Sequence, residues 1–235
     1  MNNVLLLTHI SGAIVGLIAG ALSMILRKGS SLHRLTGNIF VIAMVLMTTS
    51  AAYLAIFHKP VRINVVAAGL TFYLVGTGWL AGRRRDGQTG VLDRIGLALA
   101  VMVGLLGVAS GFEAVRSPNG MLDKFPAAGY FVFGIIALLH ASKDVTMLVR
   151  GGVTGGKRIA RHLWRISFAY LITAGSFYPG QARIFPKEWR ETGLLHAPWV
   201  LTIAAIVFWL IRVKWTSRRS AGKLRVAPQP EYRAA

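Results

Sequence analysis

The sequence predicts an all-α fold, a polytopic bundle of seven helices that cross a membrane. Of the 235 residues, 54% are hydrophobic and only 15% are charged, and the mean hydropathy is +0.55. Soluble globular domains carry about 25% charged residues, so this composition excludes that class. Apolar stretches recur along the chain, and about 20 apolar residues suffice to cross a hydrocarbon core roughly 30 Å thick.

Seven stretches meet this length requirement. Backbone amides in lipid must form hydrogen bonds within their own segment, so each stretch is expected to be a helix. No loop between them is long enough to form a separate soluble domain, and residues 1–215 are therefore predicted to form one transmembrane domain. The predicted spans are 4–27, 35–57, 63–82, 95–115, 126–149, 160–180 and 195–215.

The distribution of basic residues predicts the orientation. Eighteen of the 27 lysines and arginines fall on one side of the predicted bundle and seven on the other. By the positive-inside rule, the N-terminus of this multi-pass protein lies outside and its C-terminus is cytoplasmic. The formal net charge of +19 then favours anionic lipids at the cytoplasmic face. No basic soluble domain is present to bind nucleic acid.

The segment 216–235 is predicted to be a disordered, basic cytoplasmic tail. It mixes Arg, Lys, Pro, Gly and Ser without hydrophobic periodicity, which is typical of chains that bury too little apolar surface to fold. We expect it to rest near anionic lipid.

Small residues recur on one face of two predicted helices. In the first span Gly12, Gly16 and Gly20 have the GxxxGxxxG spacing, which lets another backbone, or a flat ligand, come close. His9 lies on the same face. The fourth span has a similar glycine pattern, and helix packing is the simpler interpretation of both.

Ionic groups lie inside two of the late spans. His140, Lys143 and Asp144 share one face of the span 126–149, and Asp144 is about five residues, or roughly 8 Å, from its cytoplasmic end. Arg165 is equally deep in the next span. Charges within a span usually face the bundle interior and pair. We therefore predict a buried ion pair between Asp144 and Arg165, either as a structural lock or as part of a proton or anion pathway.

The histidines form two groups by depth. Three are expected toward the outer face and three in the inner half, and pairs of imidazoles are among the axial ligands of haem iron. This pattern predicts haem b bound near each face, as in a carrier of electrons across the membrane. The outer group is His9, His58 and His196, and the inner group is His33, His140 and His162. Except for His58, these are the candidate cofactor-binding residues.

Two observations oppose the haem interpretation. No predicted helix carries two histidines at mid-bundle positions, and four of the six histidines lie near helix ends, where interfacial histidines are common.

A metal site is not expected either, because no HxxxH or HExxH pair is present. The absence of cysteine excludes thiolate ligands and disulfides. No GxSxG or P-loop motif marks an enzyme class.

Three segments carry a resemblance to a known family. These are Thr8–Leu22 (THISGAIVGLIAGAL), Lys28–Ala51 (KGSSLHRLTGNIFVIAMVLMTTSA) and Arg161–Tyr170 (RHLWRISFAY). Together they resemble the multi-pass bacterial membrane proteins grouped as domain of unknown function 2306. The resemblance implies a small helical membrane protein without an established activity. If that family has a shared site, the resemblance places it at His9, His33, Arg34, His162 and Arg165.

Two function classes follow from the sequence. The first is a haem-b electron carrier that passes electrons between quinol and an acceptor on the other face. The second is a non-redox membrane protein, which is either a transporter or proton-coupled channel using His140, Asp144 and Arg165, or an accessory subunit that holds a partner by its glycine faces. The sequence predicts no particular oligomeric state.

Overall fold

The computed structural model describes residues 2–178 and 181–226 of the chain. In this part the fold is almost entirely helical, and the only strands are two residues long. The elements are α1 (Asn2–Ile25), α2 (Ser31–Phe57), α3 (Arg62–Arg83), α4 (Val91–Arg116), β1 (Met121–Leu122), β2 (Phe125–Pro126), α5 (Ala127–Val149), α6 (Gly155–Phe177), η1 (Ala182–Ile184), α7 (Lys187–Glu191), η2 (Leu194–His196) and α8 (Ala197–Val226).

Six segments of the described chain are long and apolar enough to cross a membrane. They are α1 to α5 and the segment Leu194–Val213, which joins η2 to most of α8. The predicted all-helical, membrane-type fold is confirmed to this extent. The predicted span 160–180 corresponds to α6, which is long enough but less apolar. Its first half carries Lys157, Arg158, Arg161, His162 and Arg165.

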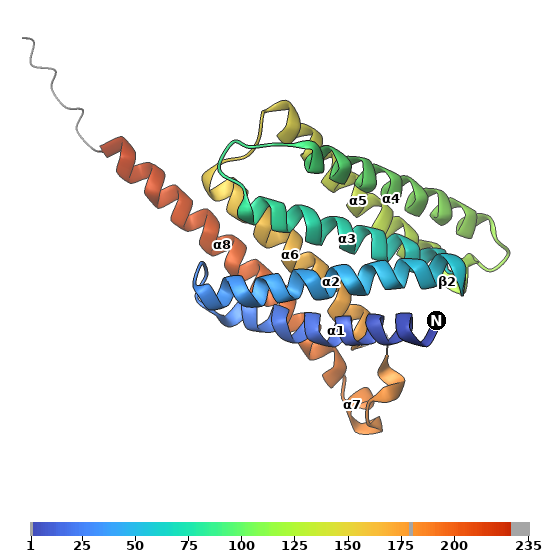
Figure 1. Cartoon of the computed structure of the whole chain (residues 1–235). Coiled ribbons are helices and arrows are strands. Elements are labelled where there is room, and N and C mark those ends of the chain that lie inside the picture. The colour runs from blue at the N-terminus through green and yellow to red at the C-terminus, as the bar shows by residue number, and fades with distance from the viewer. Residues whose placement is uncertain (1, 179–180, 227–235) are drawn as a thin grey trace, which may run out of the picture.

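The helices pack in an order that places α3 and α6 in the middle. Figure 1 shows α1 and α2 on one side of the bundle and α4 and α5 on the other. α3 packs against α2, α4, α5 and α6, while α6 also packs against α8 and α1. The core follows α3, where Leu70, Tyr73 and Leu74 are almost completely buried. A polar side chain of α6 that faces α3 is therefore shielded from lipid.

The outer faces of the bundle are apolar. Large side chains such as Leu7, Ile42, Leu105 and Leu201 are more than half exposed in the isolated chain. Soluble monomers rarely expose contiguous apolar surface of this kind, whereas hydrocarbon surrounds such residues favourably in a membrane.

The loops at the two ends of the bundle differ. At one end β1 and β2 form a hairpin whose turn, Asp123 and Lys124, has positive φ at both residues, as a two-residue type I′ turn requires. The Asp123 carboxylate accepts a hydrogen bond from the backbone N–H of Arg62 at 2.8 Å, which fixes the hairpin to the start of α3. The opposite end holds the α1–α2, α3–α4 and α5–α6 loops, and α8 extends beyond them (Figure 1).

The C-terminal helix differs from its predicted length. The sequence predicts a span that ends at 215 and a disordered tail from 216, but α8 stays helical to Val226. Polar and basic residues do not prevent a helix from continuing once a packed apolar segment has started it, because each added residue gains a backbone hydrogen bond. The rest of the predicted tail, 227–235, lies outside the described residues.

Candidate functional site

Helix α5 carries one polar face into the bundle. His140, Asp144 and Met147 are buried, and with Lys143 they follow the i, i+3, i+4, i+7 spacing of one helix face. A buried carboxylate in a membrane helix is costly unless it is paired. The partners of Asp144 therefore determine what this face can do.

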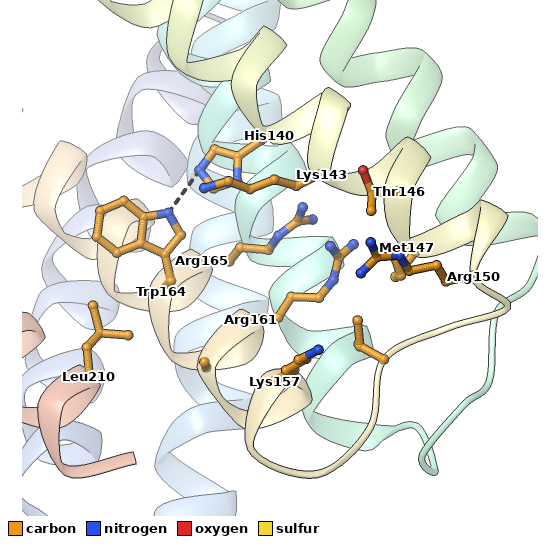
Figure 2. Close-up of a pocket in the computed structure, with 12 residues that line it drawn as sticks. His140, Lys143, Thr146, Met147, Arg150, Lys157, Arg161, Trp164, Arg165 and Leu210 are labelled. Carbon is orange, nitrogen blue, oxygen red and sulfur yellow. Dashed lines mark hydrogen bonds between the residues drawn. The ribbon is translucent and has the colours of Figure 1, made fainter. Parts of the chain in front are cut away.

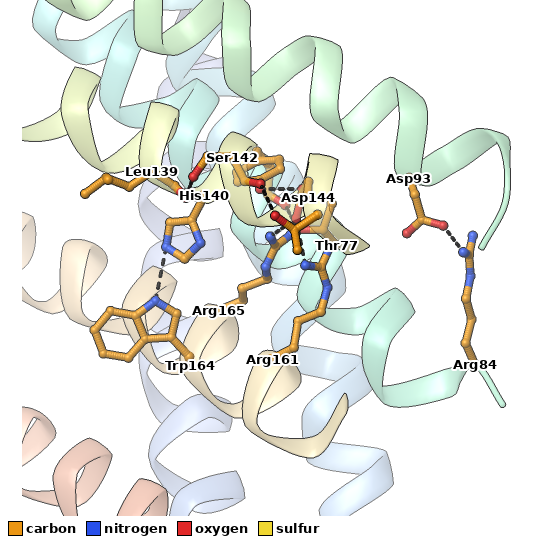
Figure 3. A network of polar contacts seen from close by, with 12 residues as sticks. Thr77, Arg84, Asp93, Leu139, His140, Ser142, Asp144, Arg161, Trp164 and Arg165 are labelled. Carbon is orange, nitrogen blue, oxygen red and sulfur yellow. Dashed lines mark hydrogen bonds and ion pairs between the residues drawn. The ribbon is translucent and has the colours of Figure 1, made fainter. Parts of the chain in front are cut away.

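Asp144 binds two guanidinium groups from α6. Its Oδ1 pairs with Arg165 Nη2 and lies 2.6 Å from Arg161 Nη1, and its Oδ2 accepts a hydrogen bond from the Tyr73 hydroxyl of α3 at 2.7 Å. Figure 3 shows the carboxylate between the two arginines. The structure thus brings the predicted partners Asp144 and Arg165 together. It adds Arg161 and Tyr73, so one negative charge faces two positive charges.

Each of the two arginines has a buried nitrogen without a protein partner. These atoms are Arg161 Nη2 and Arg165 Nη1, and the side chain of Arg165 is only 2% exposed. The Arg165 guanidinium lies over the Tyr73 ring at 4.9 Å from its centroid, which offers cation–π attraction but no acceptor atom. A buried donor of a charged group that lacks an acceptor costs several kcal/mol. A further acceptor at these two nitrogens would therefore stabilise the site.

A cavity of about 310 Å³ adjoins these two arginines (Figure 2). Ligand sites in proteins typically have volumes of roughly 300–1,000 Å³. Its walls come from α5, the α5–α6 loop, α6 and one residue of α8. The lining residues are His140, Lys143, Thr146, Met147, Arg150, Val153, Lys157, Ala160, Arg161, Trp164, Arg165 and Leu210. Five of these side chains are cationic and none is acidic.

One side of the cavity is aromatic. Trp164 Nε1 donates a hydrogen bond to His140 Nε2 at 3.1 Å, which links α6 to α5 (Figure 3). The Trp164 ring stacks on Phe168 at a centroid distance of 5.4 Å. The cavity thus combines cationic side chains at its rim and interior with one aromatic side.

Glycines explain why the cavity lies between α5 and α6. On α3, a Cβ at Gly78 would approach Arg165 Cβ to 3.0 Å and one at Gly82 would approach His162 Nδ1 to 2.7 Å, so α6 lies very close to α3. α5 packs just as closely on α4. By contrast, the backbones of α5 and α6 make few close approaches. Long side chains bridge the gap and leave room for a ligand.

Three of the predicted cofactor-binding histidines bond to backbone carbonyl groups. His9 Nδ1 lies 3.1 Å from Met47 O, His33 Nδ1 lies 3.1 Å from Ser23 O, and His162 Nδ1 lies 2.8 Å from Gly78 O. Each contact joins two different helices. As Nδ1–H donors, these rings stabilise helix packing, and His33 also lies within electrostatic reach of His162.

The two remaining candidate histidines lie apart from these. His140 lines the cavity, where its Nε2 already accepts the Trp164 N–H. His196 belongs to η2, near the other end of the bundle, and is exposed. His58, at the end of α2, contacts the Tyr53 ring at 6.0 Å between centroids.

The described residues do not fit haem b. A six-coordinate haem of the predicted kind needs two imidazoles that face each other across a space the size of a porphyrin. The larger cavity has one histidine in its lining, and a smaller one beside Arg84, Asp93 and Arg161 has none. Within 2–178 and 181–226, no group of three or more His, Asp or Glu side chains is placed to hold a metal ion.

The glycine faces predicted on two helices are packing surfaces. A Cβ at Gly12 would lie 2.9 Å from Ala43 O of α2, and one at Gly20 would lie 2.5 Å from the Tyr170 ring of α6. On α4, Gly104, Gly107 and Gly111 pack in the same way against α5. The chain itself therefore fills the surface proposed for a flat ligand or a partner.

Other carboxylates at the same end of the bundle each form an ion pair with a single arginine. Asp93 pairs with Arg84 and also accepts the backbone N–H of Gly90 at 2.8 Å. Asp86, in the α3–α4 loop, pairs with Arg158 at 2.6 Å. The adjacent Arg158 guanidinium holds the pKa of the Asp86 carboxyl below its usual value. Each of these pairs balances one charge with one charge, unlike the group around Asp144.

Sequence reasoning missed several residues of the site. Lys157 and Arg161 recur with the predicted Arg165 at intervals of four residues and so share one face of α6, but these two were counted only among the basic residues that set the orientation. Arg34, proposed through the family resemblance, lies at the start of α2 and donates a hydrogen bond to Gly29 O at 2.6 Å. It therefore closes the α1–α2 loop, away from the cavity.

Comparison with models of known families, with curated proteins and with solved structures finds no match to this chain. The resemblance to the domain of unknown function 2306 family stays a prediction.

Proposed function

We propose that this chain is an integral membrane protein that binds an anionic ligand in the cavity between α5 and α6, and that it belongs with transporters and carriers of anions. The observation that carries the proposal is the pair of buried guanidinium nitrogens, Arg161 Nη2 and Arg165 Nη1, that have no protein acceptor at the wall of a cationic cavity. Guanidinium groups recognise carboxylate and phosphate oxygens with strong, directional hydrogen bonds.

Asp144 supports this role by fixing the arginines. Its carboxylate, which accepts a hydrogen bond from Tyr73, pairs with one nitrogen of each guanidinium, so the other nitrogens are oriented before a ligand arrives. Groups that are ordered in advance lose less conformational entropy on binding. The carboxylate also offsets part of the positive charge, which keeps the two arginines stable in the core without a ligand.

The proposal includes the seventh span and the orientation. α6 has 23 residues and can cross the hydrocarbon core at about 1.5 Å per residue. Its basic half is shielded by its packing on α3 and α8. With α6 as a span the N-terminus lies outside, and the cavity opens at the basic, cytoplasmic end of a protein of the bacterial inner membrane.

A stability measurement tests the proposal. The purified protein in a neutral detergent is heated in chloride, sulfate, phosphate or pyrophosphate at constant ionic strength. A ligand at 100 times its dissociation constant adds about 2.7 kcal/mol of stability. For a chain of this size, that corresponds to a rise in Tm of roughly 5–10 °C. We expect pyrophosphate and phosphate to raise Tm and chloride to have no effect.

Matched charge variants identify the site. Lys143→Gln and Lys157→Gln remove rim charges from exposed positions, and we expect each to reduce the shift in Tm. Arg94→Gln removes one charge from an exposed position on α4 at the same end of the bundle and should leave the shift unchanged. Equal shifts in all four proteins would mean that the anion binds elsewhere or only screens charge, and the proposal would fail.

The haem-b electron carrier stays a prediction that no described contact favours. Its test is independent of the anion measurement. Protein expressed with haem supplied should show a Soret band and a reduced α-band if the prediction is correct, and His9→Ala, His140→Ala, His162→Ala and His196→Ala should change that spectrum.

A further inference from the structure

The geometry points to the ligand class: we propose that the cavity binds the phosphomonoester headgroup of a membrane lipid, with the acyl chains leaving between α5 and α8. This inference rests on the proposed function, because it identifies which anion the cavity takes. Three features of the cavity support it: its charge, its depth and the open side between two helices.

The charge favours a multivalent anion. Five cationic side chains line the cavity, and Asp144, which pairs with two of them, offsets one charge. An excess of four positive charges is more than a monovalent phosphodiester or carboxylate neutralises. A phosphomonoester carries about −1.5 to −2 at neutral pH and presents three acceptor oxygens, which suits two guanidinium nitrogens and the ammonium groups at the rim.

The depth favours a ligand that belongs to the bilayer. Arg161 and Arg165 lie six and ten residues into α6, which begins at Gly155, or roughly 9–15 Å along its axis. The rim residues Arg150 and Lys157 lie at the helix ends, where headgroups are found. A lipid phosphate that enters past the rim can reach the two arginines while its chains remain in the hydrocarbon region.

In a membrane, an acyl chain can leave the cavity on the side between α5 and α8. α5 packs on α4 and α3, α8 packs on α6, and α5 and α8 make few close approaches to each other. Leu210 of α8 and Trp164 of α6 both line the cavity (Figure 2). With Phe168, which stacks on Trp164, these side chains provide an apolar path for an acyl chain.

Fluorescence quenching by brominated lipid tests the proposal. Trp164 lines the cavity, so a bound lipid with a brominated acyl chain should quench it. The protein is placed in phosphatidylcholine nanodiscs at pH 8, with increasing fractions of brominated phosphatidic acid, a phosphomonoester, or of brominated phosphatidylglycerol, a phosphodiester. We expect phosphatidic acid to give half-maximal quenching at a lipid fraction at least tenfold lower than the fraction of phosphatidylglycerol that is needed.

Variants localise the signal. The Trp164→Phe protein lacks the tryptophan that lines the cavity, so it should lose the component of quenching that depends on phosphatidic acid. The other tryptophans remain in this variant and should still report quenching by lipid outside the cavity. Lys143→Gln combined with Lys157→Gln should remove most of the preference, and both positions are exposed, so folding should be preserved. Arg94→Gln should keep the preference. Half-maximal quenching of the unmodified protein at equal fractions of the two lipids would overturn the proposal.

A soluble headgroup separates the two proposals. Glycerol 3-phosphate has the same phosphomonoester without acyl chains. The comparison is short-chain phosphatidic acid, used below its micellar limit. We expect glycerol 3-phosphate to need a concentration at least tenfold higher to give the same rise in Tm in detergent. Equal potency would show that the chains contribute nothing, so the lipid proposal would fail while anion binding stands. No effect of either compound, together with no effect of phosphate or pyrophosphate, would overturn both proposals.

Discussion

The two sides of α5 are built in opposite ways. Toward α4, Gly134 packs so closely that an added Cβ would lie 2.7 Å from the Val108 backbone nitrogen. Toward α6, the backbones stay apart, and the contacts are an ion-pair group around Asp144 and a hydrogen bond between His140 and Trp164.

This difference shows how one helix can serve both as a support and as a wall of a site. Small residues let helices in lipid come close and pack without water, so the α4 side fixes the position of α5. The α6 side is held by long polar side chains that can leave a space between them. Rigid packing on one side keeps the ionic groups of the other side in a fixed geometry.

The largest expected effect comes from removing the shared carboxylate. Asp144→Ala leaves two guanidinium groups in the core without their counter-charge, and breaking a buried pair in this way costs about 3–5 kcal/mol. We expect a large fall in Tm in detergent, with part of the loss recovered in high phosphate, which can supply negative charge at the same arginines. Asp86→Ala, in an exposed pair, is the control and should change Tm little.

An unchanged Tm in Asp144→Ala would show that the α6 side of α5 does not depend on ionic contacts. A loss that phosphate does not recover would indicate that the lock is purely structural.

The next largest effect should come from the side of α5 that packs closely on α4. Gly134→Val inserts a branched side chain against the α4 backbone, and overpacking of a close interface costs about 1–3 kcal/mol. The expected result is a lower Tm with no change in anion preference. Gly37→Ala is the matched control, because nothing lies within 4 Å of its Cβ position, and replacing glycine inside a helix should stabilise by up to about 1 kcal/mol. Equal effects of the two variants would contradict close packing at Gly134.

A smaller effect is expected at the aromatic end of the cavity. Trp164→Phe removes the N–H donor to His140 but keeps an aromatic ring beside Phe168, and one such hydrogen bond contributes about 0.5–1.5 kcal/mol. We expect a modest fall in Tm. His140→Ala in the Trp164→Phe background should cost less than in the unmodified protein, since the bond is already lost. Additive losses would show that the two side chains are not coupled.

The smallest effect concerns a basic group outside the cavity. Lys28 lies in the α1–α2 loop, 4.4 Å from the Trp209 ring centroid of α8, and burial lowers its pKa from 10.5 to about 8. Between these pH values the unfolded chain holds a proton that the folded chain releases, so stability rises with pH through this window. Comparing Tm at pH 8 and pH 10.5 should show this rise in the unmodified protein, and Lys28→Met should reduce it. An equal rise in both proteins would exclude Lys28 as the cause.

Sequence patterns located the helices better than their ends. Long apolar runs identified the spans because burial in lipid depends mainly on composition, and this is a property of a segment by itself. The start of α2 at Ser31 precedes the predicted 35, because Ser30 caps the helix by accepting the His33 N–H at 3.1 Å. Polar caps and basic first turns lie outside the apolar run that marks a span, so composition places the boundary too late.

The candidate site was partly visible. Asp144 and Arg165 stood out because charges are rare in membrane spans, and equal depth made them plausible partners. Arg161 was counted only among the basic residues that set the orientation, although its side chain is 11% exposed and pairs with Asp144. The histidines were grouped by depth alone. Depth does not say which way a ring points, and three of these rings point at backbone carbonyl groups of neighbouring helices.

Composition and charge alone determined that this protein is a helical membrane protein with basic loops, since both depend on the affinity of each segment for lipid or water. Only the tertiary structure decided that Arg161 joins Arg165 on one carboxylate, and that a cavity remains beside them. Those features depend on how closely α5 approaches α4 and how far it stays from α6, and these distances follow from the contacts between helices that are remote in sequence.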